Sequence, residues 1–171
     1  MKKKFTLFTV AALSLFALGA CSTTTPTKKE TSDSATKASS TTEAATNTEY
    51  KVGDTIVFKD VAEITITNVA WTDERNSVSD IVANKVLLVT YNLTNLTDDD
   101  YVVGEDIDLY VNNKSTESYP VGTILETIAA GRSIEGAVQH FAVTGEGPYE
   151  LEVEPSFSWD VEPAIVKLDL Q

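Results

Sequence analysis

The chain has 171 residues and a mass of 18.5 kDa, and 13 Lys and Arg against 26 Asp and Glu give it a net charge of −13. One Cys and one His exclude an internal disulfide and a Cys/His zinc site, and the acidity argues against nucleic acid as a partner. The 42% hydrophobic content is enough for one folded core. Since only the N-terminus has an uninterrupted apolar stretch, a polytopic membrane protein is excluded.

Residues 1–20 have the features of an export signal. Three Lys residues at positions 2–4 precede 16 uncharged residues, fewer than the roughly 20 that a spanning helix needs. The next feature, Leu18-Gly19-Ala20-Cys21, resembles the lipobox of bacterial lipoproteins. The resemblance implies cleavage between Ala20 and Cys21 and acylation of Cys21, which would anchor the chain on the extracellular face of the cell membrane. The alternative is an ordinary signal peptide followed by a free thiol.

Residues 21–49 are expected to be the lipidated Cys and a disordered linker. Residues 22–49 contain ten Thr, five Ser and four Ala, and no aromatic or large aliphatic side chain, so they cannot bury enough apolar surface to offset the entropy of ordering. As a flexible coil this linker would average roughly 30 Å end to end and could not exceed about 100 Å. We therefore expect the folded part to stay near the membrane.

Residues 50–171 carry most of the charge, with seven Lys and Arg against 22 Asp and Glu, a net charge of −15. This acidity is usually a solvated surface, and a cation or a basic partner is the alternative.

The same residues predict an all-β domain. Seven segments alternate apolar and polar side chains, namely residues 55–58, 64–69, 85–93, 106–111, 133–143, 149–153 and 166–170. The most apolar of them, residues 85–93, is the best candidate for a central strand. Residues 124–130 could form one short helical turn. About seven strands in about 120 residues favour an antiparallel sandwich, with a small barrel as the alternative.

In the segment 106–111, the alternation places Ile107, Leu109 and Val111 on the inner face. It places Asp106, Asp108 and Tyr110 on the opposite face.

Several segments together resemble the immunoglobulin-like domains of unknown function found in Gram-positive lipoproteins, which are similar to the immunoprotective extracellular immunoglobulin-like superfamily. These segments are residues 52–55, 64–69, 72–76, 85–97, 117–120, 130–133 and 166–170. The resemblance implies an antiparallel Ig-like sandwich outside the cell and identifies no functional residue beyond Cys21. Residues 72–84 form a loop without a recognisable turn motif.

An acidic cluster is the first candidate site within the domain. It contains six carboxylates within 11 residues, namely Asp98, Asp99, Asp100, Glu105, Asp106 and Asp108. Carboxylates suit a hard cation, but Val102 and Val103 stand where an EF-hand loop needs a ligand and a Gly. We expect a solvated acidic hairpin and predict no metal or other cofactor.

The other candidates are weaker. His140 has no neighbouring nucleophile motif, so a structural or surface role is favoured over a general base. Glu150 and Glu152 share one strand face and could support acid–base chemistry. An exposed cluster among six large aromatics would suggest a binding patch, although packing is the simpler role for Trp71, Tyr101, Tyr110, Tyr119, Phe157 and Trp159.

Two functional classes follow from these observations. The first is a non-enzymatic, lipid-anchored binding or scaffolding module that holds a protein or wall polymer near the membrane. The second is a small carboxylate- or metal-dependent hydrolase acting on wall material, which needs two carboxylates facing each other across a cleft. We favour the first, because the sequence lacks any combination of nucleophile, base and oxyanion hole.

Overall fold

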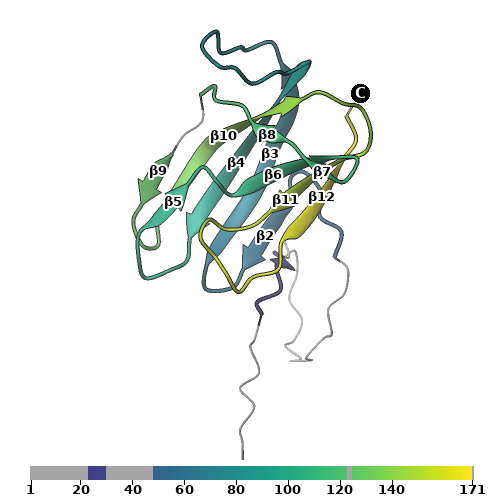
Figure 1. Ribbon diagram of the computed structural model, residues 1–171. Helices are drawn as coiled ribbons and strands as arrows, with labels where there is room; N and C mark the ends of the chain where they lie inside the picture. The colour runs from purple at the N-terminus through teal and green to yellow at the C-terminus, as the bar shows by residue number, and fades with distance from the viewer. Residues whose placement is uncertain (1–22, 30–47, 123–124, 171) are drawn as a thin grey trace, which may run out of the picture.

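The computed structural model describes residues 23–29, 48–122 and 125–170, and every regular element in this part of the chain is a β-strand. The strands form two layers that pack face to face, with a two-stranded ribbon at one side (Figure 1). The predicted all-β antiparallel sandwich is therefore confirmed. The predicted export signal, with Leu18, Gly19, Ala20 and Cys21, lies outside the described residues.

The larger sheet has six strands in the order β1-β2-β3-β4-β10-β8, and all neighbouring strands are antiparallel. The strand bounds are β1 Thr27–Lys28, β2 Thr55–Phe58, β3 Ala62–Thr72, β4 Lys85–Asn95, β8 Glu117–Ser118 and β10 Ser133–Val143. As predicted, β4 is central, because it pairs with β3 on one side and with β10 on the other.

The smaller sheet has four strands in the order β12-β11-β6-β7, and the ribbon pairs β5 with β9. The strand bounds are β5 Tyr101–Val103, β6 Ile107–Val111, β7 Lys114–Ser115, β9 Glu126–Ile128, β11 Tyr149–Val153 and β12 Ala164–Leu168. The seven predicted strands correspond to the seven described strands of four or more residues, β2, β3, β4, β6, β10, β11 and β12.

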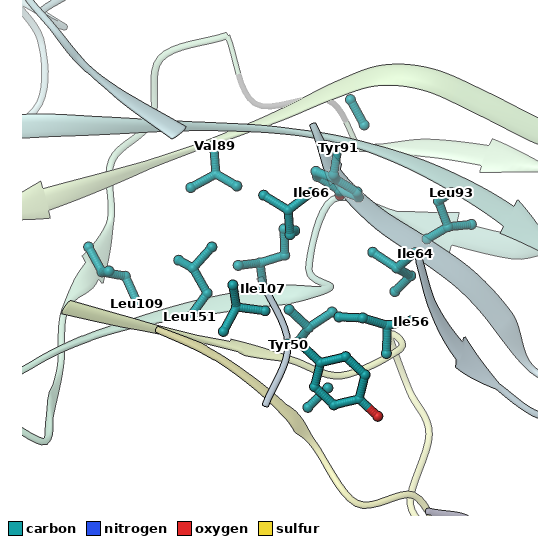
Figure 2. Packing of buried hydrophobic residues seen from close by; sticks show 14 of the residues in the cluster. Tyr50, Ile56, Ile64, Ile66, Val89, Tyr91, Leu93, Ile107, Leu109 and Leu151 are labelled. Carbon is teal, nitrogen blue, oxygen red and sulfur yellow. The ribbon is translucent and has the colours of Figure 1, made fainter. Parts of the chain in front are cut away.

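The core fills the space between the two sheets. Inward side chains of β3 and β4 face those of β6 and β11 (Figure 2). Alternate residues of each strand point inward because the side-chain period of a strand is two. Ile64 and Val89 on one side, and Leu109 and Leu151 on the other, are completely buried.

One bulge in the larger sheet has an identifiable cause. The register between β4 and β10 shifts between Ile134 and Ala137, and Gly136 adopts a φ of 72° there. This left-handed conformation suits a residue without a Cβ. The amide of Gly136 donates to Asn92 Oδ1 at 2.9 Å.

The helical turn expected within residues 124–130 is wrong for the residues that the structure describes. Glu126–Ile128 forms β9, which pairs with Tyr101–Val103. Pairing buries Ile128 and overrides the local helical tendency.

The expectation of a disordered linker is wrong for residues 23–29. The backbone of Thr27–Lys28 pairs with the edge of β2, and the amide of Lys29 donates to the carbonyl of Thr55 at 2.9 Å. Thr24 lies against Val161 in an isolated bridge, and Pro26 is buried. The small polar side chains of this segment bury little apolar surface, but a free sheet edge binds a segment through its backbone. We call residues 23–29 the strap.

Tyr50 connects the strap to the rest of the domain. Its hydroxyl donates to the carbonyl of Pro26 at 2.8 Å in a buried position, and its backbone forms a bridge with Val166. Burial raises the pKa of Tyr50, so the hydroxyl stays protonated and remains a donor at neutral pH.

We predict that Tyr50→Phe weakens the strap without unfolding the sandwich. The lost hydrogen bond leaves a buried carbonyl without its donor, which costs about 1 kcal/mol. Urea unfolding of the variant should show this loss, and hydrogen exchange should accelerate at the amides of Thr24 and Lys29. Tyr149→Phe is the control, because Tyr149 packs in the core away from the strap. Unchanged exchange at both amides in Tyr50→Phe would contradict the prediction.

Candidate functional site

The predicted acidic cluster does not form one site. Asp98, Asp99 and Asp100 are exposed in the loop between β4 and β5, and Glu105 and Asp108 are exposed beside β6. Asp106, expected on the solvated face, is instead only 1% exposed. Within residues 23–29, 48–122 and 125–170, no group of three or more His, Cys, Asp or Glu side chains is arranged to hold a metal ion.

Asp106 is buried because hydrogen-bond donors surround its carboxylate. Tyr91 and Tyr101 donate their hydroxyls at 2.8 and 2.6 Å, and the amide of Gly104 donates at 3.0 Å. The hydroxyl of Ser156 also donates at 3.0 Å, and its amide donates at 3.3 Å. A buried charge with this many donors can be accommodated, whereas an unpaired one is very costly.

The same network protects both tyrosines from ionisation. Burial, followed by the negative charge of Asp106, raises the pKa of Tyr91 and of Tyr101 far above the ordinary value. Both hydroxyls therefore remain donors throughout the physiological range. The carboxylate and its donors connect β4, β5, the start of β6 and the loop that follows β11.

The loop after β11 places two aromatic rings in solvent. Ser156 is held by the Asp106 network, and Phe157 follows it with a φ of 59°. Phe157 is 67% exposed and Trp159 is 90% exposed. We call residues 154–163 the aromatic loop. Of the six aromatics considered from the sequence, Tyr101 and Tyr119 are buried, and Trp71 and Tyr110 are half-buried.

A shallow hollow of about 220 Å³ separates the aromatic loop from the outward face of β6 and β11. Asp108 lies opposite Glu152 across the two strands. Burial, followed by the charges of Asp108 and Glu154, raises the pKa of Glu152, and a hydrogen bond with Tyr110 partly opposes this. The pKa of Glu152 is therefore higher in the folded chain than in the unfolded chain. As the pH rises from the unfolded to the folded pKa, ionisation of Glu152 lowers the stability of the domain.

A larger groove of about 950 Å³ runs along β12. Its walls come from the strap, residues 48–52, the middle of β3 and the last strand. The groove combines apolar side chains such as Val52, Val69 and Ile165 with the exposed ion pair between Lys167 and Glu49, whose atoms are 3.1 Å apart. Its volume is typical of sites that bind small or extended ligands. Glu150 lies at its border, and its partner in the predicted pair, Glu152, lies in the shallow hollow instead.

His140 is 2% exposed and lies on the outer side of the larger sheet. Its Nε2 lies 3.1 Å from Glu74 Oε2, and its backbone carbonyl accepts from Tyr119. The loop of residues 72–84 covers this face, with Ile81 and Ala83 packed on Val86 and Ala142. This environment supports the structural role expected for His140.

Sequence reasoning did not identify three features of this region: the Asp106 network, the strap and the groove. The sequence does contain the side chains involved, namely Tyr91, Tyr101 and Ser156 around Asp106 and the β-forming Thr residues near the N-terminus. Neither signal specifies a partner far away in the sequence.

We predict that Asp106→Asn destabilises the domain strongly. The amide nitrogen would replace one acceptor oxygen and would face a donor, so the free energy of unfolding should fall by about 2–3 kcal/mol. Urea unfolding followed by tyrosine and tryptophan fluorescence measures the change. Asp108→Asn, two residues away and exposed, should change it by less than about 0.5 kcal/mol. Equal effects of the two substitutions would contradict a special role for the buried carboxylate.

The fold of this chain is similar to two solved structures from Bacillus subtilis. The first is ycdA, a candidate lipoprotein, with 23% sequence identity and a TM-score of 0.57 over 71% of this chain and 39% of ycdA. The second is yjhA, with 20% identity and a TM-score of 0.53 over 70% of this chain and 99% of yjhA. Our chain thus corresponds to well under half the length of ycdA and to nearly all of yjhA.

No family model matches the chain, and no curated protein sequence matches it. No helix in the described part of the chain is long and apolar enough to cross a membrane. At these identities, the two structural neighbours show a shared fold and no more.

Proposed function

We propose that the chain is an exported lipoprotein, acylated on Cys21, whose β-sandwich is a non-enzymatic binding module on the extracellular face of the cell membrane. The observation that carries this proposal is the position of the strap. Thr24, three residues after Cys21, is hydrogen-bonded to the domain on both sides, through its amide to Asp160 at 2.8 Å and through its carbonyl to Glu162 at 3.0 Å. Three residues span at most about 10 Å, so an acyl chain on Cys21 would hold the sandwich close to the membrane.

Further support comes from the sequence and from the fold. The lipobox-like segment Leu18-Gly19-Ala20-Cys21 and the basic, apolar segment before it are the arrangement that lipoprotein export needs. The neighbour ycdA is itself described as a candidate lipoprotein. Two acyl chains on Cys21 would give a stable anchor, because each buried methylene contributes about 0.8 kcal/mol.

The groove along β12 is the surface that suits a ligand best. It lies beside β12, the edge strand of the smaller sheet, where Tyr50 forms a bridge with Val166, and it combines apolar contacts with the Lys167–Glu49 pair. We therefore infer that the groove binds an extended peptide or wall polymer beside the membrane.

A hydrolase is less well supported. Glu152 has the raised pKa that a general acid needs, but it lies on an outward sheet face beside the shallow hollow of about 220 Å³. Glycoside hydrolysis needs a substrate held between two carboxylates, and this shallow hollow offers little enclosure. The geometry therefore supports binding over hydrolysis.

We predict that Cys21→Ser prevents acylation and releases the chain from the membrane or leaves it unprocessed. Metabolic labelling with an alkyne-bearing fatty acid should label the natural chain and leave the variant unlabelled. Membrane fractionation and the intact mass of the mature chain provide the second readout. An unchanged mass and unchanged fractionation in the variant would contradict the proposed anchor.

We predict that a photo-crosslinking residue at position 165 captures a recurrent ligand in cells. Ile165 points outward from β12 and lines the groove, so a bound chain would lie within reach of it. The control has the same photo-reactive residue at position 114, in β7 on the opposite edge of the same sheet. Mass spectrometry should find a species that is specific to position 165. Equal capture at both positions, or none at 165, would argue against the groove.

A further inference from the structure

We propose that the aromatic loop contacts the lipid bilayer beside the anchor, with the rings of Phe157 and Trp159 at the level of the headgroups. In the cell this contact rests on the proposed acylation of Cys21. It adds a second membrane contact, and with it a fixed orientation of the sandwich on the membrane.

The backbone beside the two rings is anchored to the sandwich. Pro155 is buried, Ser156 is bonded to Asp106, and the amide of Ser158 donates to the carbonyl of Pro155 at 3.2 Å. The positive φ of Phe157 sets the direction of its side chain. Phe157 and Trp159, at 67% and 90% exposed, thus lie in a loop whose backbone is bonded to the sandwich.

The aromatic loop is also where the strap meets the sandwich. Thr24 forms a bridge with Val161, and its amide donates to the carbonyl of Asp160, the residue after Trp159. The strap and the loop lie together at the lower end of the sandwich (Figure 1). Since Thr24 is the third residue after Cys21, an acyl chain on Cys21 would bring this end within about 10 Å of the bilayer.

The bilayer is the occupant that this position favours. Tryptophan is enriched at membrane interfaces, because its ring is apolar and its N–H can bond to water or headgroups. The neighbouring carboxylates of Glu105, Glu154 and Asp160 must stay hydrated, so the rings can enter only to the headgroup level. The same carboxylates repel anionic lipids, which makes zwitterionic headgroups the better surface.

The chain contains its own control for a test of this contact. Its second tryptophan, Trp71, is the second-last residue of β3 and packs edge-on against Tyr149, with ring centroids 5.6 Å apart. The strand β3 ends at the upper end of the sandwich (Figure 1). Trp71 is nine residues from Ala62, the first residue of β3, and nine residues of a strand span about 30 Å. Bilayer contact at the aromatic loop therefore leaves Trp71 far from lipid.

The experiment uses the mature chain, residues 21–171, coupled through its only Cys to a maleimide-bearing phospholipid in phosphatidylcholine vesicles. Trp71→Phe leaves Trp159 as the fluorophore, and Trp159→Phe leaves Trp71. Vesicles of the same lipid, brominated in the acyl chains near the headgroup, quench nearby tryptophan. We expect a roughly twofold loss of Trp159 emission and little change for Trp71.

Absence of Trp159 quenching in the coupled protein would overturn the proposal and leave the aromatic loop free for a protein or wall partner. Equal quenching of both tryptophans would also overturn it, because the sandwich would then lie flat.

An insertion of about twelve Gly and Ser residues between Ser22 and Thr23 should reduce Trp159 quenching, since the connection to the lipid would no longer be short. Unchanged quenching after the insertion would contradict the inference that the short connection from Cys21 to Thr24 brings Trp159 to the lipid. Because the coupling is chemical, a failure of acylation in cells would leave these results intact.

Discussion

A single buried carboxylate, that of Asp106, connects the parts of this structure. Its donors come from β4 in the larger sheet, from β5 in the ribbon and from the loop after β11 in the smaller sheet. Burying an ionised carboxylate is favourable only when donors replace its water. The arrangement therefore favours one relative position of the three strand systems, since moving any of them would remove donors from the buried carboxylate.

The features with functional interest all lie around β12. The groove has this strand as one wall, the aromatic loop leads into it, and the strap forms its bridge with Val161 just before it. The hydrogen bonds of Ser156 link this region back to Asp106. The interior network thus helps to set the shape of this surface, because Asp106 and Ser156 also line the shallow hollow beside the aromatic loop.

The sequence predicted the sandwich well because alternation of apolar and polar residues is a local signal. The inward sets Leu87, Val89, Tyr91 and Leu93 in β4 and Ile107, Leu109 and Val111 in β6 are all buried as expected. Asp106 continues the polar phase of β6, so alternation alone placed it in solvent. Its burial depends on Tyr91, Tyr101 and Ser156, which the chain brings together only in three dimensions. The strap was missed for a similar reason, because its backbone pairing needs no apolar side chain.

The strap also has a mechanical consequence. A force applied from the N-terminal side would act first on the bonds of Thr24 and on the pairing of β1 with β2. If they gave way, the chain from Thr24 to Thr48 would become part of the tether and add up to about 80 Å. The folded domain could then move farther from the membrane while its core stayed intact.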